Sequence, residues 1–304
     1  MISYEQIKNK PRILSSLTGL TPAAFGQLVR SFKQAYEQAL VHSDNQRKQP
    51  RQRQQGGGRK ATLASSEDKL LFILFYFKLY PIQELQGFLF RLSQAQVNYW
   101  IHSLTPILNQ ALGYEQQLPA RKTRDIEQML AACLELEFIL DGTERLIQRP
   151  KDRQRQRDNY SGKKKRHTVK NNVISHKPTK KIKALSPTEP GKIHDKKLAD
   201  QEQYRFPAGS KLWKDTGFQG YEPDEVITYQ PKKKPRGGEL TAAEKQENQA
   251  IAKERIGVEH SIGGVKVFHI VRDIYRNHKQ GFEDLIMETA CGLHNLRLDF
   301  LMTA

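Results

Sequence analysis

Two aspartates in this sequence follow short runs containing apolar residues and precede glycines, a pattern typical of acids presented at strand ends. Asp141 follows residues 138–140, which predict a short buried strand, and Gly142 predicts a turn that leaves Asp141 at the rim of a sheet. Asp215 follows residues 211–214 and precedes Gly217 in a similar way. An Asp-Gly pair after an apolar strand is most often an ordinary turn, so these acids need partners elsewhere in the chain.

A third acid, Glu259, lies in a helix predicted over residues 251–268. Arg255, Glu259 and Lys266 are spaced by four and by seven residues, so at roughly 100° per residue they share one face of the helix. Two aspartates from strands and a glutamate from a later helix can hold a pair of divalent cations through oxygen ligands, as in phosphodiester chemistry. The alternative is an exposed Arg255–Glu259 pair that stabilises the helix only weakly.

Four segments of the chain resemble, in order and spacing, those of DDE transposases of the bacterial insertion-sequence-five group, within the RNase H-like superfamily. They are residues 141–144, residues 160–168, residues 215–221 and the series Arg255, Glu259, Lys266. The resemblance implies that Asp141, Asp215 and Glu259 are the catalytic acids and hold two Mg²⁺ or Mn²⁺ ions, while Arg255 and Lys266 hold phosphates. Ala252 stands where the group often carries a tyrosine.

Two further acids compete for the same roles. Asp195 stands at the start of a predicted helix, where a carboxylate stabilises the helix N-terminus without any metal. Glu254 does not share a helix face with Arg255 and Lys266. We therefore expect capping from Asp195 and no catalytic role for Glu254.

The 304-residue chain is strongly basic, with 50 Lys and Arg against 33 Asp and Glu and a formal net charge of +17. This balance predicts a polyanionic partner, with nucleic acid favoured over an anionic membrane surface. No apolar run of about 18 residues and no signal-peptide pattern is present. We expect a cytoplasmic, nucleoid-associated protein without a membrane partner, which acts as a homo-oligomer on double-stranded DNA. The two cysteines, Cys133 and Cys291, lie far apart and do not support a disulfide framework or a zinc site.

Changes in composition predict four parts along the chain. Thr21 and Pro22 have the pattern of a helix cap and a first-turn proline in the N-terminal part. The second part is rich in Gln, Arg and Gly and has nothing to bury. The four parts are a helical unit (1–42), a basic linker (43–60), a helix-turn-helix-like DNA-binding region (61–112) and a domain over residues 121–304, for which the resemblance implies an RNase H-like catalytic fold.

The helix-turn-helix-like region consists of three predicted helices, over residues 66–80, 81–90 and 93–108. Ser93 is the expected N-cap of the third helix, which exposes Gln94, Gln96 and Asn98 near its start. Amide side chains at this position suit adenine edges in the major groove. A helical bundle without a DNA-binding role would produce the same pattern.

Two runs of basic residues follow Asp141, and a third begins near residue 231. Residues 149–157 and the run Lys163, Lys164, Lys165 and Arg166 predict solvated loops that could also grip phosphates beside the cut site. Residues 167–174 and 181–185 predict two strands, antiparallel to the first as in an RNase H-like sheet.

Together these features predict an α/β catalytic domain, with an RNase H-like mixed sheet flanked by helices, preceded by an all-α DNA-binding domain. The predicted function is an insertion-sequence transposase that cleaves DNA at transposon ends and transfers the strand to a target. Two alternatives remain open. The first is a noncatalytic DNA-binding regulator, and the second is a host DDE-type nuclease without strand transfer.

Overall fold

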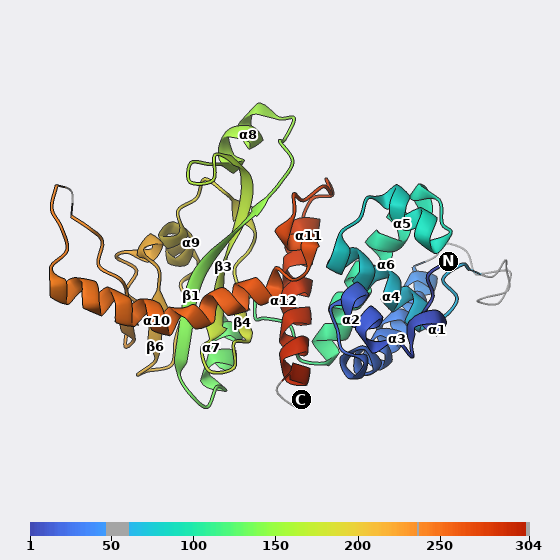
Figure 1. Cartoon of the computed structure of the whole chain (residues 1–304), viewed down its shortest axis with the longest axis horizontal. Coiled ribbons are helices and arrows are strands. Elements are labelled where there is room, and N and C mark those ends of the chain that lie inside the picture. The colour runs from blue at the N-terminus through green and yellow to red at the C-terminus, as the bar shows by residue number, and fades with distance from the viewer. Residues whose placement is uncertain (47–60, 236, 302–304) are drawn as a thin grey trace. The chain divides into compact units, whose positions relative to one another are not determined.

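The computed structural model describes residues 1–46, 61–235 and 237–301, and the side chains of residues 255–260 fall outside this description. The chain divides into two compact units (Figure 1). The helical unit holds residues 1–118, 267–270 and 285–304, and the sheet unit holds residues 119–266 and 271–284. Most of the predicted basic linker, residues 47–60, lies outside the described residues.

The helical unit begins with α1 (Tyr4–Ile7), α2 (Pro11–Thr18) and α3 (Pro22–Asn45). The predicted cap of α3 is confirmed, because the Thr21 hydroxyl accepts a hydrogen bond from the Ala24 N–H at 3.2 Å. The Gln46 N–H still donates to the His42 carbonyl at 3.2 Å. Helical hydrogen bonding therefore continues past residue 43, where the linker was predicted to begin.

Three helices occupy the predicted helix-turn-helix-like region: α4 (Ser66–Leu79), α5 (Gln83–Phe90) and α6 (Gln94–Tyr114). α4 is the centre of the unit, since residues 69–77 are all buried and the helix contacts α2, α3 and α6. A helix with apolar residues nearly all round is stable only inside a protein. Tyr80 and Arg91 adopt left-handed conformations directly after α4 and α5 and end these helices sharply.

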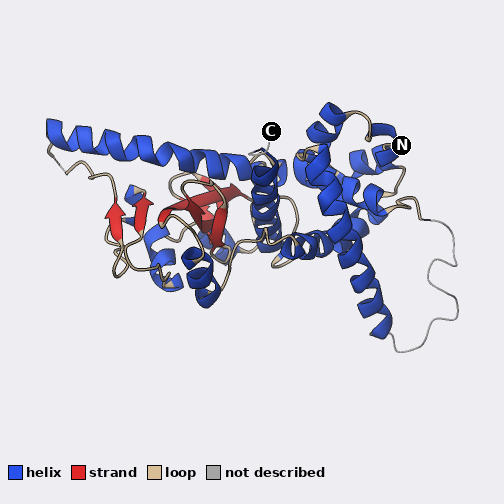
Figure 2. Cartoon of the chain, turned by 90° about the horizontal axis from the view of Figure 1, so that it is seen from below, coloured by secondary structure: helices blue, strands red, loops and turns tan. Residues whose placement is uncertain are grey.

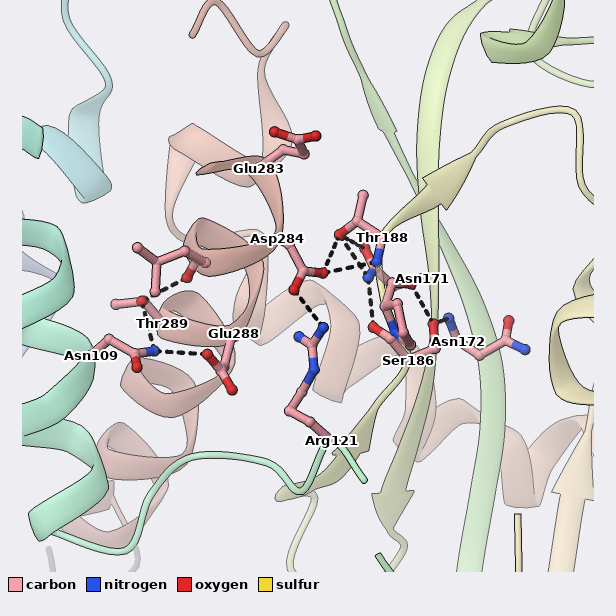
Figure 3. Close-up of polar contacts among 12 residues, drawn as sticks. Asn109, Arg121, Asn171, Asn172, Ser186, Thr188, Glu283, Asp284, Glu288 and Thr289 are labelled. Carbon is pink, nitrogen blue, oxygen red and sulfur yellow. Dashed lines mark hydrogen bonds and ion pairs between the residues drawn. The ribbon is translucent and has the colours of Figure 1, made fainter. Parts of the chain in front are cut away.

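The last helix, α12 (Phe282–Leu301), follows α11 (His269–Arg272). Its residues from 285 onward belong to the helical unit, whereas the sequence-based boundary placed them in a domain of residues 121–304. Asn109 of α6 donates to Glu288 and Thr289 at 3.1 Å each (Figure 3), and Asn295 donates to the Gln117 carbonyl at 2.8 Å. Periodicity indicates that a helix has a buried face, but not which partner covers that face.

The sheet unit is built on a mixed seven-stranded sheet. β1 lies between β3, which pairs with it antiparallel, and β6, which pairs with it parallel. β7 continues the sheet beyond β6, and β2, β4 and β5 pair with β3. The strands are β1 (Glu137–Leu146), β2 (Tyr160–Ser161), β3 (Arg166–His176), β4 (Ile182–Leu185), β5 (Glu189–Pro190), β6 (Lys211–Lys214) and β7 (Ile227–Tyr229).

Helices cover both faces of this sheet (Figure 2). α10 (Ala242–Val265) lies on one face, where Ile251 packs with Ile139 of β1 and Trp213 of β6. On the opposite face, Phe138 and Leu140 of β1 share a core with residues of α7 (Thr123–Ala131) and α9 (Asp195–Glu202). Alternate residues of β1 therefore serve two cores, as expected for a central strand. We name these surfaces the α10 face and the α9 face.

The prediction that the first strand ends at Asp141 is wrong. β1 continues past Asp141 and remains paired with β3 to the end of the strand. Only the parallel pairing with β6 stops before Asp141, at Leu140 and Lys214. Gly142 is therefore not a turn residue. A Cβ atom at Gly142 would lie 2.8 Å from Cγ of Asp195, so the glycine is required for a close approach between β1 and α9.

The basic run at residues 149–157 is not entirely a loop as predicted, because it contains most of α8 (Arg153–Asn159). Asp152 caps this helix by accepting a hydrogen bond from the Arg155 N–H at 2.8 Å, which stabilises a short helix despite its many like charges. α10 begins with a capping box, in which Thr241 and Glu244 each accept from the other's backbone N–H.

The first turn of α12 is anchored within the sheet unit through Asp284 (Figure 3). Its carboxylate accepts hydrogen bonds from Arg121 at 2.5 Å and from the Thr188 N–H at 2.8 Å. Burial alone would raise the pKa of Asp284, but the bonds from Arg121 and Thr188 outweigh burial and the pKa is lowered. None of the helices in the described part of the chain has a stretch that could span a lipid bilayer.

Candidate active site

Asp141 and Asp215 lie at equivalent positions, directly after the last residues that pair the neighbouring strands β1 and β6 with each other. β1 and β6 run parallel, and their last paired residues are Leu140 and Lys214, so the two aspartates are the next residue on each chain segment. Neighbouring strands lie about 4.8 Å apart, which brings the two backbones close together at this edge. The predicted approach of these two acids therefore has a direct basis in strand register.

The two aspartates also lie on the same face of the sheet. Ile139 and Trp213, two residues before each acid, pack on the α10 face. Successive side chains of an extended chain point to opposite faces, so Asp141 and Asp215 are directed to the same face as Ile139 and Trp213. Each aspartate is half-buried.

Local hydrogen bonds orient both carboxylates in the same way. Oδ1 of Asp141 accepts from the N–H of Gly142 at 2.8 Å, and Oδ1 of Asp215 accepts from the N–H of Thr216 at 2.7 Å. The second bond also caps the short 3₁₀ helix η1 (Thr216–Phe218). These bonds hold the two carboxylates in similar positions relative to the backbone that follows them.

α10, the helix that contains Glu259, packs on this face. Ile251 packs against the α10 face of the sheet, and Ile262 packs against the same cluster. The side chains of Arg255 and Glu259 lie outside the described residues. Their catalytic and phosphate-binding roles therefore stay predictions, although the backbone of α10 crosses the correct face.

Glu254, the alternative to Glu259 as the third acid, forms an ion pair with Lys177. Its carboxylate lies 2.6 Å from Nζ of Lys177, and the same ammonium lies 3.1 Å from Glu137 at the start of β1. Lys177 also lies 4.0 Å from the centroid of the Trp213 ring. Glu254 thus anchors α10 to the sheet.

Lys266, directly after α10, lies within electrostatic range of the site. Burial lowers the pKa of its ammonium, Lys164 lowers it further, and Asp141 and Glu144 act in the opposite direction. Because its ammonium interacts electrostatically with Asp141 and Lys164, Lys266 lies near the first candidate acid and near the predicted basic run. Its phosphate-binding role stays a prediction.

The basic run Lys163, Lys164, Lys165 and Arg166 is exposed. It forms a tight turn between β2 and β3, in which Lys165 adopts a left-handed conformation with φ of 54°. The turn is closed by a bond from the Lys164 N–H to the Ser161 hydroxyl at 3.2 Å. Four adjacent exposed cations are suited to phosphate contact, and that role also stays a prediction.

In the helical unit, Gln94, Gln96 and Asn98 are all exposed at the start of α6, as predicted. Gln96 has a second function that the sequence analysis missed. Its Oε1 accepts a hydrogen bond from the Ser93 N–H at 2.9 Å and completes a capping box. Bidentate pairing with adenine needs that oxygen, so Gln96 is a weaker candidate for base reading than Gln94 or Asn98. The spacing Ser-x-x-Gln was the available signal.

Asp195 does not cap α9 as expected. The N-cap position belongs to His194, and Asp195 is the first helical residue. Oδ1 of Asp195 accepts from the buried Lys170 at 2.9 Å, and the carboxylate lies against Gly142 and Gly217. Lys170 and Glu144 face each other across β3 and β1 and, like Gly142, lie on the α9 face. Asp195 is thus on the opposite side of β1 from Asp141.

Lys214, a fully buried residue directly before Asp215, was also missed. Its ammonium donates to the Tyr221 carbonyl and lies 2.6 Å from Glu222. Burial alone would raise the pKa of Glu222, but bonds from Lys214 and Thr228 outweigh burial and lower it. Lys214 therefore closes the loop that starts at Asp215. A lysine at the end of the short strand, directly before the candidate acid, was the available signal.

The donor chemistry at the α10 face fits hard divalent cations. Carboxylate oxygens from Asp141 and Asp215 are the ligands that Mg²⁺ and Mn²⁺ prefer. Among the described side chains, no group of three acids, histidines or cysteines is close enough to hold a metal ion. Glu259, which would supply the third carboxylate, is not one of those side chains.

Two protein families and a named protein match this chain. The family described as "DDE superfamily endonuclease" matches residues 140–295, and the family "Helix-turn-helix of DDE superfamily endonuclease" matches residues 61–113. A protein of Microchaete diplosiphon, named "Probable transposase for insertion sequence element IS702", is 30% identical over 232 residues, which cover 76% of this chain and 80% of the relative. No solved structure gives a significant match.

Proposed function

Because the chain belongs to the DDE superfamily of endonucleases, we propose that it is the transposase of an insertion sequence. In this proposal it cleaves double-stranded DNA at transposon ends and joins the freed strand to a target. The similarity to a probable insertion-sequence transposase over most of both chains supports this reaction over simple cleavage. The order and spacing of the acidic and basic motifs support membership of the insertion-sequence-five group.

The observation that carries the proposal is the placement of Asp141 and Asp215. Both acids follow equivalent positions on parallel strands and both are directed to the face that α10 covers. Glu259 lies on that helix. We assign the three carboxylates as the ligands of two Mg²⁺ or Mn²⁺ ions. Such ions, when bound, supply positive charge to the attacking and leaving oxygens of an in-line phosphodiester displacement.

The remaining tasks fall to side chains around this face. Lys266 and Arg255 bind phosphates next to the acids. The exposed turn with Lys163, Lys164, Lys165 and Arg166 binds the flanking DNA backbone without sequence preference. Gln94 and Asn98, at the start of α6, read base edges. The antiparallel pairing of β1 with β3 and the parallel pairing of β1 with β6 support an RNase H-like sheet.

The setting of the reaction follows from the same chemistry. DNA ends must be brought together before a strand is transferred, so we assign a homo-oligomer assembled on DNA. The high positive charge supports a protein that stays on the bacterial nucleoid in the cytoplasm.

A supercoiled plasmid with the transposon ends tests the proposal, because cleavage and joining can be scored in one reaction with Mg²⁺. We expect the wild-type chain to cut and join, and Asp141→Asn to do neither while it still binds the ends. Asp200→Asn is a matched control, since Asp200 is an exposed residue of α9 that pairs with Lys196 at 2.6 Å. Normal cutting by Asp141→Asn would refute the assignment of the acids.

The same assay separates the two alternatives. Cleavage without joined products would favour a host nuclease. Specific binding without cleavage, by wild-type and variant chains alike, would favour a noncatalytic regulator.

A further inference from the structure

A buried ionic cluster lies behind the two aspartates, on the α9 face. Lys170 of β3 is 5% exposed, and its ammonium lies 2.9 Å from Oδ1 of Asp195 and 3.4 Å from Oε1 of Glu144. Glu144 and Lys170 are direct partners in the β1–β3 register. One buried cation thus compensates two carboxylates that come from different elements of the fold.

The carboxylate of Asp195 touches the backbone beside both catalytic candidates. A Cβ atom at Gly142 would lie 2.8 Å from Oδ1 of Asp195, and a Cβ atom at Gly217 would lie 3.0 Å from Oδ2. Gly142 follows Asp141 directly, and Gly217 lies two residues after Asp215. The two oxygens of a single side chain therefore lie against the two segments that present the aspartates.

This contact occurs where the sheet stops holding those segments together. The backbone pairing of β1 with β6 ends at Leu140 and Lys214, so no strand pairing fixes the segments beyond that point relative to each other. The Asp195 side chain lies against both segments at this point, on the α9 face. Only glycine permits this approach, because any side chain at Gly142 would displace the carboxylate.

Further hydrogen bonds hold the cluster in place. Asn172 of β3 donates to the backbone carbonyl of Asp195 at 3.1 Å, which fixes the start of α9. The Ser161 hydroxyl donates to Glu144 at 2.9 Å and also accepts from the N–H of Lys164 in the basic turn. Hydrogen bonds from two elements thus restrain both carboxylates that pair with Lys170.

We propose that Asp195 and Lys170 are positioning residues that set the separation of Asp141 and Asp215. This inference rests on the proposed function, in which those two aspartates share divalent cations. Asp195 does not ligate the cations, because it lies on the opposite side of β1 and its oxygens face Lys170 and the two glycines. Removing the Asp195–Lys170 pair should make the positions of Asp141 and Asp215 more variable without removing any metal ligand.

Two variants test this role in the full-length protein. Asp195→Asn keeps the size of the side chain but loses its charge pair with Lys170. Gly142→Ala leaves every charge in place but forces the Asp195 carboxylate away. We expect each variant to raise the dissociation constant for Mn²⁺, measured by calorimetry without DNA, by about tenfold or more, as for other residues that orient metal ligands.

The control is Asp200→Asn, an exposed acid on the same helix, which should bind Mn²⁺ as wild type does. Circular dichroism confirms folding of each variant, and Lys170→Arg, which keeps the buried charge, should bind more tightly than Lys170→Met. A wild-type Mn²⁺ affinity in both Asp195→Asn and Gly142→Ala would overturn the inference.

Amide hydrogen exchange without metal gives a second readout that does not depend on the proposed function. We expect faster exchange at Gly142 and Thr216 in Asp195→Asn than in wild type. If wild type binds no Mn²⁺ but exchange rises in the variant, the proposed function fails and the positioning role stands. If Mn²⁺ binding is lost while exchange is unchanged, Asp195 acts as a ligand and the positioning role is wrong.

Discussion

The ammonium of Lys177 lies 4.0 Å from the centroid of the Trp213 ring. Lys177 directly follows β3, and Trp213 lies on β6, two residues before Asp215. Because the same ammonium pairs with Glu254 of α10, this relationship fixes the helix that carries the third acid onto the strands that carry the first two.

We expect Lys177→Met to lower the free energy of unfolding by about 1 to 2 kcal/mol, as for a partly desolvated cation–π contact with ion pairs. Burial alone lowers the pKa of Lys177, but bonds from Glu254 and Glu137 outweigh it and raise the pKa above 10.5. This stabilisation is complete below the unfolded pKa of 10.5 and is lost as the pH rises through the folded pKa. Urea unfolding at pH values on both sides of that pKa should show the stability difference between wild type and Lys177→Met shrinking at high pH. As a control, Lys196→Met removes an exposed ion pair and should lower the free energy of unfolding only slightly at any pH.

The three predicted acids should converge when cations are bound. Asp141, Asp215 and Glu259 should then share ions about 3.5 to 4 Å apart, and Glu259→Gln should abolish cleavage as Asp141→Asn does. Glu247→Gln, at an exposed position of α10 that pairs with Lys232 at 3.0 Å, is the control and should cleave normally. A crystal structure with Mn²⁺ measures the distances, and carboxylates more than about 10 Å apart would contradict the site.

Removing charge from the turn between β2 and β3 should weaken binding to all DNA sequences alike. Alanine at Lys163, Lys164 and Lys165 removes up to three phosphate contacts, and each lost contact should flatten the log–log salt dependence by about 0.9. Binding to end-containing and scrambled duplexes at several salt concentrations measures this slope. A change in the preference between the two duplexes would assign base reading to the turn instead.

Substitutions at the start of α6 should act on sequence preference. Gln94→Ala and Asn98→Ala should each reduce the preference for the transposon end by about 1 to 3 kcal/mol, with nonspecific binding nearly unchanged. Gln96→Ala should instead cost about 1 kcal/mol of stability, because it removes part of the capping box. Competition binding and thermal unfolding separate the two effects. An unchanged preference in both Gln94→Ala and Asn98→Ala would place end recognition elsewhere.

Asp284→Asn should destabilise the sheet unit by about 1 to 3 kcal/mol near neutral pH, since charge-assisted bonds from Arg121 and Thr188 are lost. The pKa of Asp284 is lowered in the folded chain, so its contribution is present above the unfolded value of 3.8 and is lost as the pH falls through the folded pKa. Acid titration of stability should therefore show wild type and variant converging below that range. Asp200→Asn, which lacks such a buried setting, should track wild type throughout.

The sequence alone determined the features that depend on local contacts. Caps at Thr21 and Ser93 predicted helix starts correctly, because the bond of a cap reaches only two or three residues along the chain. Motif order and spacing likewise pointed to the family that the comparisons identify.

Tertiary structure decided what each acid and glycine does. Gly142 reads as a turn in sequence, yet β3 pairs with it and Asp195 packs against it from α9. Asp195 reads as a cap, yet a buried lysine from β3 binds it. Local patterns cannot carry this information, because strand register and burial bring together residues that are far apart in the chain, and the free energy of a buried charge depends on which of them surround it.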